Sequence, residues 1–309
     1  MGDIILEINH LSKKYKDVKA VNKLSLKIES QMVYGLLGPN GSGKTTTLGM
    51  LLGVIRPTEG DFSWFGNGQE DVNRMKIGAL LETPNFYPYL TAEQNLELVA
   101  KIKGIDLNPE SIDTNSKSID DILELVGLSD RRNSKFSTYS LGMKQRLAIG
   151  SALLGNPEVL VLDEPTNGLD PQGIAEIRDL IIEIGKTDKT IIIASHILDE
   201  IEKVCTHCAI LRKGELLQTG TIKDIIGNQD VTLIKLAAND IDALKKAINQ
   251  IDKVSIYKEV GDEIIIRTES GTKTSDINQL FFDKGIVLSA LNMFNESLEN
   301  QFLEIVGKS

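Results

Sequence analysis

The sequence has few of the features that mark membrane-spanning, secreted or nucleic-acid-binding chains. Its formal net charge is −10 over 309 residues, whereas proteins that track nucleic-acid phosphates carry basic patches, so we expect no nucleic-acid partner. No uninterrupted apolar run approaches the roughly 20 residues that cross a bilayer, and Met1-Gly2-Asp3 does not begin a charged and then apolar signal segment. We expect a cytoplasmic chain that lies peripherally at the inner face of the membrane only through a partner.

Cysteine is also scarce. The two cysteines form a single C-x-x-C, Cys205-Thr206-His207-Cys208. This spacing occurs in zinc and redox sites, but the sequence offers no second pair of ligands. Because the pair lies where a helix predicted over 197–204 meets a strand predicted over 209–211, we expect buried or partly buried free thiols.

The most informative segment is residues 38–46, GPNGSGKTT, which matches the pattern G-x-x-x-x-G-K-[ST]. A strand predicted over 32–37 precedes it and a helix predicted over 45–54 follows it, as this phosphate-binding loop requires. Glycines allow backbone N–H groups to face the α- and β-phosphates, and the helix points its positive dipole end at the same anion. Lys44 is expected to reach the β- and γ-phosphates, and the Thr45 hydroxyl to ligate Mg²⁺.

An acidic motif follows a second strand pattern. Residues 159–162 are a continuous apolar run, typical of a strand buried on both faces of a parallel sheet, and the run ends in Asp163-Glu164. Ligands of such sheets collect at the carboxyl ends of the strands, so both carboxylates are expected beside the phosphate loop. Asp163 would hold Mg²⁺ through water, and Glu164 would polarise the attacking water. A solvated loop is the alternative for an isolated Asp-Glu pair.

Three further motifs complete an ordered series. Residues 139–147, YSLGMKQRL, precede the acidic strand, while 168–170, GLD, and a strand over 190–195 that ends at His196 follow it. This series resembles the ATP-binding subunits of ABC transporters over about residues 1–225. The resemblance implies an α/β fold with a P-loop ABC-type ATPase core: a RecA-like parallel sheet, a β-rich N-terminal layer, and a helical subdomain over about 86–154. It also implies ATP and Mg²⁺ as cofactors, a transmembrane permease, and a homodimer that forms on ATP binding.

The resemblance assigns a role to each matched position. Glu164 would be the general base and His196 a second catalytic residue that contacts the γ-phosphate. The nucleotide-binding residues would be Tyr15, which stacks on adenine, with Gly38, Asn40, Gly41, Ser42, Gly43, Lys44, Thr45 and Thr46. Asp170 would link the two sites of a dimer. The signature residues would complete the site of the other subunit, and they are Ser140, Leu141, Gly142 and Met143. Phosphoryl transfer independently requires donors around all the equatorial γ-oxygens, which one phosphate loop does not supply.

Simpler readings stay open for three of these residues: Tyr15 as a strand-end aromatic, Ser140 as a helix N-cap only, and His196 as a core histidine. Two positions depart from the common pattern, because Leu141 stands where glycine is usual and Glu82 where glutamine is usual. Together with residues 85–91, NFYPYLT, these departures resemble the ATPases of bacitracin and lantibiotic self-protection transporters. Glu82 is expected to contact Mg²⁺ and to relay its presence to a partner-facing segment, 86–90.

A different pattern begins near residue 230 and carries no catalytic motif. The order of predicted elements is strand (231–236), helix (241–251), strands (254–258 and 263–268), helix (275–283) and strand (286–291), which is the ferredoxin-like α+β plan. A last helix is expected to begin at Asn295, with Glu296 in its first turn. The predicted domains are thus 1–226, with an exit from the core over 220–227, and 227–309, either a structural or dimer-supporting appendage or a regulatory or docking module.

The sequence therefore predicts an Mg²⁺-dependent ATPase subunit that drives a separate permease, exporting an antimicrobial peptide or lantibiotic for self-protection and antibiotic resistance. One alternative is a soluble ABC-type ATPase that acts as a mechanical switch on a partner such as the ribosome. Such proteins usually carry two nucleotide domains or long coiled-coil insertions, and this sequence has neither. The other alternative, a nucleotide-binding scaffold without turnover, is disfavoured by the intact Glu164 and His196.

Overall fold

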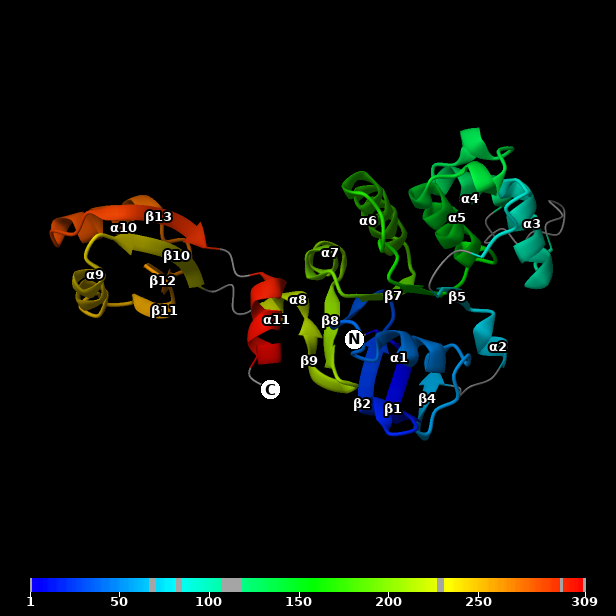
Figure 1. Ribbon diagram of the computed structural model, residues 1–309, viewed down its shortest axis with the longest axis horizontal. Helices are drawn as coiled ribbons and strands as arrows, with labels where there is room; N and C mark the ends of the chain where they lie inside the picture. The colour runs from blue at the N-terminus through cyan, green and yellow to red at the C-terminus, as the bar shows by residue number, and fades with distance from the viewer. Residues whose placement is uncertain are drawn as a thin grey trace. The chain divides into compact units, whose positions relative to one another are not determined.

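The computed structural model describes residues 2–66, 71–81, 85–106, 118–226, 231–294 and 297–307. Glu82 and the two residues predicted to start the last helix, Asn295 and Glu296, lie outside this part of the chain. The chain divides into two compact units, Met1–Ile222 and Lys223–Ser309. Figure 1 labels the helices and strands of both units.

A six-stranded sheet forms the centre of the first unit, in the order β5-β6-β7-β3-β8-β9. The strands are β3 (Val33–Leu37), β5 (Ile77–Leu80), β6 (Val159–Asp163), β7 (Thr190–Ser195), β8 (His207–Arg212) and β9 (Glu215–Thr221). β3, β6 and β7 are buried along their whole length, as their continuous apolar runs predict. The expectation of a parallel sheet needs one correction: the sheet is mixed, because β9 returns antiparallel to β8 through a tight turn.

An antiparallel sheet in the order β2-β1-β4 forms the predicted β-rich layer, from β1 (Ile4–Tyr15), β2 (Val18–Glu29) and β4 (Glu59–Trp64). Its apolar residues share one core with α1 (Lys44–Leu51) and the central sheet, so α1 lies between the two sheets. Helices α6 (Pro171–Gly185) and α7 (Leu198–Val204) lie on the other side of the central sheet (Figure 1). The phosphate-loop helix is therefore held in the interior of the unit.

The predicted helical region contains α3 (Ala92–Ile102), α4 (Ile119–Leu125) and α5 (Leu141–Leu153) within its described residues. Each begins at a side chain that can bond to free backbone N–H groups. Thr91 and Ser118 form capping boxes with the third residue of α3 and α4, and Ser140 accepts from the backbone of Met143. Short elements complete this unit: α2 (Asp71–Arg74), η1 (Ser129–Arg131) and η2 (Phe136–Thr138).

The second unit contains a four-stranded antiparallel sheet in the order β11-β12-β10-β13. Its elements are β10 (Val231–Ala238), α9 (Ile241–Ile248), β11 (Ser255–Val260), β12 (Glu263–Glu269), α10 (Thr274–Asp283), β13 (Leu288–Phe294) and α11 (Leu298–Gly307). Alternate residues of β10 join α9 and α10 in a separate core around Phe281. The order of elements agrees with the predicted strand-helix-strand-strand-helix-strand sequence.

The predicted exit from the core, 220–227, contains the end of a strand and a short helix within its described residues. Strand β9 continues through Thr221, and α8 (Ile222–Ile226) follows it directly. The backbone N–H of Ile222 donates to the carbonyl of Thr206 at 3.0 Å, and Ile222 and Ile225 are buried. Buried apolar side chains and this hydrogen bond explain why Gly220 does not end the strand.

The cysteines are free and buried, as predicted. Burial raises the pKa of Cys208 to about 12 and raises that of Cys205 well above its ordinary value. Both cysteines pack close to Gly35 of β3, where an added Cβ atom would lie 3.3 Å from the Cys205 sulfur and 3.4 Å from the Cys208 Cβ. The C-x-x-C is thus a packing feature of the core.

Candidate nucleotide site

The loop between β3 and α1 owes its shape to glycines. Gly41 and Gly43 have φ angles of 79° and 104°, a region that residues with side chains rarely adopt. At Gly43 a Cβ atom would also lie 2.4 Å from the carbonyl oxygen of Ala20. Backbone conformation and lack of space therefore both require glycine at position 43. Helix α1 begins at the next residue, so its N-terminus lies at the loop, as phosphate binding needs.

Lys44 lies at the base of this loop and is 5% exposed. Its Nζ donates to the carbonyl oxygen of Gly38 at 2.8 Å and lies 3.4 Å from Glu164 Oε1. A buried ammonium group needs a counter-ion or hydrogen-bond acceptors, and both are present. A phosphate group can replace the carboxylate, because it offers more negative charge to the same ammonium.

Glu164 and His196 follow neighbouring parallel strands. The backbone N–H of Glu164 donates to Ala194 at the end of β7, and His196 Nδ1 lies 2.7 Å from Glu164 Oε2. Glu164 has a φ of 47°, and such strained positions concentrate at functional sites. The His196 side chain is 36% exposed, so the structure places it at the edge of the site and not in the core.

The predicted nucleotide-binding residues surround one cavity of about 630 Å³. Those that line it are Tyr15, Asn40, Gly41, Ser42, Gly43, Lys44, Thr45, Thr46, Glu164 and His196. Gly38 lies beneath the loop and contributes its carbonyl to Lys44. The structure therefore brings together side chains that are separated by up to 181 positions in the sequence (196 − 15).

Tyr15 ends β1 at the rim of this cavity and is 46% exposed. Lys13 Nζ lies 5.0 Å from the centre of its ring. An exposed ring beside a phosphate loop can stack on a nucleobase. The exposure of Tyr15 at the cavity rim leaves both predictions for it open, a base-stacking residue and an ordinary strand-end aromatic.

The oxygen donors beside the loop suit Mg²⁺. Thr45 lines the cavity, whereas Asp163, which is 2% exposed at the end of β6 and directly precedes Glu164, is not among the residues that line it. Mg²⁺ typically takes one or two carboxylates together with phosphate oxygens and water, so these side chains fit a metal that arrives with a nucleotide. Among the described residues no group of three His, Cys, Asp or Glu side chains could hold a metal alone.

The signature residues lie at a different cavity, of about 420 Å³. Ser140, Leu141 and Gly142 line it together with Asp170, the N-cap of α6, whose carboxylate accepts from the backbone of Gly173 at 2.8 Å. Ser140 also caps α5, with its hydroxyl accepting from the N–H of Met143 at 3.2 Å. Capping and a role toward a second subunit are compatible, because the cap leaves Ser140 exposed.

Sequence reasoning missed several residues that line the nucleotide cavity: Val18, Lys19, Ala20, Asn167 and Lys213. Asn167 lies between two recognised motifs and could have been proposed from its position. The others belong to the start of β2 and to the β8–β9 turn, which approach the phosphate loop only through tertiary packing. The sequence predicts a turn at Lys213-Gly214, but it does not show that this turn lies beside the phosphate loop.

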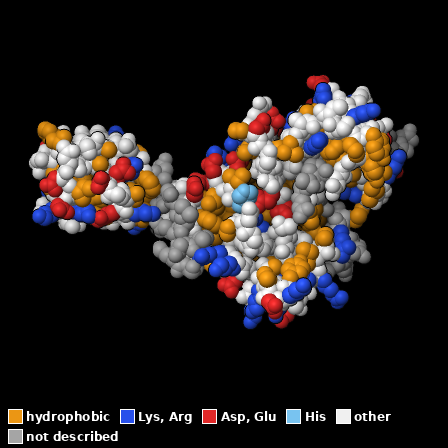
Figure 2. Space-filling view, viewed as in Figure 1, with side chains coloured by type: hydrophobic (Ala, Val, Ile, Leu, Met, Phe, Trp, Pro, Cys, Tyr) orange, Lys and Arg blue, Asp and Glu red, His pale blue; other side chains and the backbone are white. Residues whose placement is uncertain are grey.

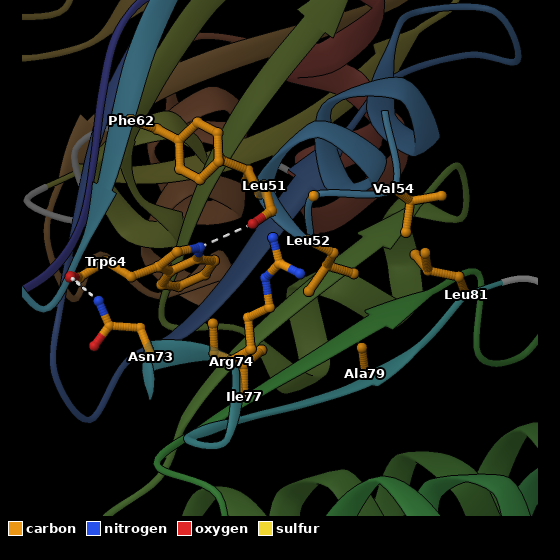
Figure 3. A pocket seen from close by; sticks show the side chains of 11 residues that line it. Leu51, Leu52, Val54, Phe62, Trp64, Asn73, Arg74, Ile77, Ala79 and Leu81 are labelled. Carbon is orange, nitrogen blue, oxygen red and sulfur yellow. Dashed lines mark hydrogen bonds between the residues drawn. The ribbon is translucent and has the colours of Figure 1, made fainter. Parts of the chain in front are cut away.

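A third cavity, of about 340 Å³, is largely apolar (Figure 3). The C-terminal end of α1, strand β4 and strand β5 form its walls through Leu51, Trp64 and Ala79. The Trp64 ring donates to the Leu51 carbonyl at 2.9 Å, which fixes the indole in place. Arg74 extends between Trp64 and Leu52 and supplies the cationic group of this cleft (Figure 3).

Comparisons with known proteins agree with this geometry. A family model described as ABC transporter matches residues 21–167. The bacitracin transport ATP-binding protein of Bacillus licheniformis is 39% identical, covering 98% of this chain and 97% of that protein. An uncharacterized ABC transporter ATP-binding protein of Bacillus subtilis is 36% identical, with 99% and 97% covered.

Solved structures match a smaller share of the chain. A component of an ABC transporter complex from Clostridium perfringens has a TM-score of 0.64 and 28% identity, covering 72% of this chain and 90% of that one. An ATP-binding cassette in a dimeric post-hydrolysis state bound to ADP and Pi has a TM-score of 0.59 and 25% identity, covering 70% and 98%.

No helix within the described ranges is long and apolar enough to cross a membrane. The phosphate loop, Glu164 and His196 line one cavity. The loop and Glu164 lie within residues 21–167, which the family model matches. Relatives at up to 39% identity share nearly the whole chain. The chain therefore belongs to the ATP-binding, ATP-hydrolysing subunits of ABC transporters.

Proposed function

We propose that this ATPase subunit powers a permease that exports a peptide antibiotic of the bacitracin or lantibiotic type, and so protects its host. Two relatives support this cargo: the bacitracin transport ATP-binding proteins of Bacillus licheniformis and Enterococcus faecalis, at 39% and 35% identity over 98% and 99% of the chain. The subunit lies on the cytoplasmic side and is held at the membrane by the permease.

The observation that carries the chemistry is the convergence of Lys44, Glu164 and His196 at one cavity. When ATP binds, Lys44 exchanges Glu164 for the β- and γ-phosphate oxygens. Glu164 then accepts the proton of the attacking water. His196 holds Glu164 through Nδ1 and directs its other ring nitrogen toward the γ-phosphate. Bound Mg²⁺, held by Thr45, Asp163 and Glu82, would neutralise charge that builds on the phosphates.

Each ATP is proposed to lie between two copies of the chain. The signature cavity around Ser140, Leu141 and Gly142 is distinct from the nucleotide cavity, and a single loop leaves part of the γ-phosphate open to water. The start of α5 in a second subunit can supply the missing donors through the Ser140 hydroxyl and the first backbone N–H groups of the helix, while the Met143 N–H is bonded to Ser140. Asp170 lies beside these residues and links the two sites.

We place the permease contact at the apolar cleft of Figure 3 and at the segment 86–90, where Tyr87 and Tyr89 are exposed. Helix α1 connects it with the nucleotide, because the helix begins at Lys44 and its last residue, Leu51, lines the cleft, about 10 Å away at 1.5 Å per residue. Strand β5 leads into Leu81, which also lines the cleft and directly precedes Glu82. A short permease segment with apolar side chains suits this shape and lining.

The proposed domains are 1–226, the ATPase, and 227–309, an accessory domain on the ferredoxin-like plan. The sheet order β11-β12-β10-β13 and the two helices that share its core support this assignment. The nucleotide-binding and catalytic motifs recognised in the sequence all lie within the first unit. We therefore assign this domain a structural role in assembly and not in catalysis.

The cargo is tested in the host strain. Deletion of the chain should lower the bacitracin or lantibiotic concentration that stops growth, and wild-type protein should restore it, whereas Glu164→Gln should not. ATP hydrolysis by the purified protein is measured in parallel. If deletion leaves sensitivity to these peptides unchanged while the protein hydrolyses ATP, the ATPase assignment stands and the proposed cargo is wrong.

A further inference from the structure

The turn between β8 and β9 carries a lysine at a position where the backbone conformation favours Gly, Asn or Asp. Arg212 and Glu215 pair across the strands, and the two residues between them, Lys213 and Gly214, have φ angles of 49° and 82°. Tight hairpin turns with two positive φ angles favour Asn-Gly, Asp-Gly or Gly-Gly, because a residue with a longer side chain is strained there. A lysine at the first position is therefore a strained choice that the turn itself does not require.

This turn is bonded to the phosphate loop. The backbone N–H of Gly214 donates to the carbonyl of Ser42 at 3.0 Å, and its carbonyl accepts from the N–H of Asn22 in β2 at 2.8 Å. A Cβ atom on Gly43 would lie 3.5 Å from the Gly214 Cα. Because these contacts fix the turn on the loop, the position of the Lys213 Cα relative to a bound phosphate is also fixed.

The Lys213 side chain lines the nucleotide cavity together with Tyr15 and Val18. It is exposed, and it has no salt bridge within the described part of the chain. The turn contacts the loop from the side of β2, at Ala20 and Asn22, whereas Glu164 approaches Lys44 from β6. The turn that carries Lys213 therefore lies on the β2 side of the loop, and β2 begins at Val18, the partner of Tyr15.

We propose that Lys213 is a nucleotide-binding residue whose ammonium group pairs with the α-phosphate of ATP and ADP. The proposal rests on the nucleotide site described above. Strained residues concentrate at functional sites, and among the lysines with a positive φ it is Lys213 that lines the cavity. A free cation at the rim of a cavity attracts a polyphosphate toward it in a chain that is otherwise acidic. Lys44 then serves the β- and γ-phosphates, and Lys213 serves the opposite end.

The test compares nucleotide affinities of purified full-length variants. Lys213→Asn removes the cation and suits a left-handed backbone, so folding should be retained, as the melting temperature will show. We expect the Kd values for ATP, ADP and AMP to rise by about threefold to tenfold, with kcat at saturating ATP within about twofold of wild type. The difference should shrink as salt is raised, because the cation is exposed, and Lys213→Arg should retain the affinity.

Lys23→Asn is a matched control. Lys23 is also an exposed lysine with a positive φ, 50°, but it does not line the cavity, so its replacement should leave every Kd unchanged. Lys44→Ala serves as the positive control for the site itself. If Lys213→Asn binds ATP as wild type does while Lys44→Ala loses binding, the proposal for Lys213 is wrong and the site stands. If Lys44→Ala also binds normally, the site assignment fails.

The series of nucleotides tests the placement. An effect of similar size for ATP, ADP and AMP agrees with a contact at the α-phosphate, which all three share. An effect confined to ATP would put Lys213 at the γ-phosphate and overturn the placement. Adenosine binding should not change, and a loss of adenosine affinity would show that the substitution had altered the base-binding end instead.

Discussion

The two units bury their strands in different ways, and this difference explains where the chemistry lies. Strands β3, β6 and β7 of the first unit are buried residue after residue, whereas β10 of the second unit buries every other residue. Parallel strands joined by helices end at one edge of a sheet, so the phosphate loop, Glu164 and His196 meet there. Antiparallel strands alternate in direction, so neighbouring strand ends are placed at opposite edges.

The comparisons with known proteins divide in the same way. Relatives of nearly full length share both units, whereas the solved cassettes cover 70–72% of the chain. Acidic and basic side chains are mixed over the face of the second unit that Figure 2 draws, which favours a solvated surface. We infer that the first unit carries the chemistry common to the family. We also infer that the second unit has a role specific to the relatives that match over nearly the full length.

The strongest way to test this division is to remove the base from the first unit. Glu164→Gln keeps the shape of the side chain but cannot accept a proton, so turnover should fall by about 10²-fold or more. ATP should still bind and hold two subunits together, which size-exclusion chromatography with and without ATP will show.

Lys44→Ala should also lose turnover, yet it should not dimerise, because a charge-assisted phosphate contact worth roughly 1.5–3 kcal/mol is missing. Full activity of Glu164→Gln would rule out its role as base.

The second test destabilises the other unit. Phe281 is fully buried in the core of the second unit, and Phe281→Ala should lower the free energy of unfolding of that unit by about 3–5 kcal/mol. Basal ATP hydrolysis should remain, because the catalytic motifs lie in the first unit, which has a core of its own. Phe282 is 65% exposed, so Phe282→Ala should change stability by about 0.5 kcal/mol or less in a thermal melt. Loss of hydrolysis in Phe281→Ala alone would show that the units are coupled.

Within the first unit, Glu82 should separate hydrolysis from coupling. Glu82→Gln retains an oxygen for the metal, so basal hydrolysis should stay within about tenfold, near 1.4 kcal/mol of barrier. Glu82→Ala should reduce cellular protection more than basal hydrolysis, which measurements of ATPase rate and growth inhibition will compare. Unchanged values of both in Glu82→Ala would mean that this carboxylate is simply solvated. A loss of hydrolysis as complete as in Glu164→Gln would assign it to the chemistry.

The sequence predicts those parts of the fold that depend on local pattern. The glycine-rich loop and the apolar runs over 159–162 and 190–193 each identify an element without reference to its neighbours. Strands β1 and β2 extend beyond their apolar cores into polar residues, because each strand pairs with the other up to Tyr15 and Val18. Contacts of this kind depend on tertiary structure, which is also why Lys213 and the start of β2 were not recognised as walls of the cavity.

The smallest expected effect concerns the two thiols, which report on the first unit alone. Cys205 and Cys208 are buried there, and the raised pKa of Cys208, about 12, leaves a thiolate fraction of about 10⁻⁴ at pH 8. Alkylation of the native protein at this pH should therefore be slow and should become rapid in guanidinium chloride. Phe281→Ala should leave the native rate unchanged although it unfolds the second unit more easily, because no cysteine lies in that unit. Mass spectrometry after timed alkylation measures both rates. Faster labelling in Phe281→Ala would mean that the second unit supports the core of the first. The stability of the catalytic unit would then depend on the accessory unit.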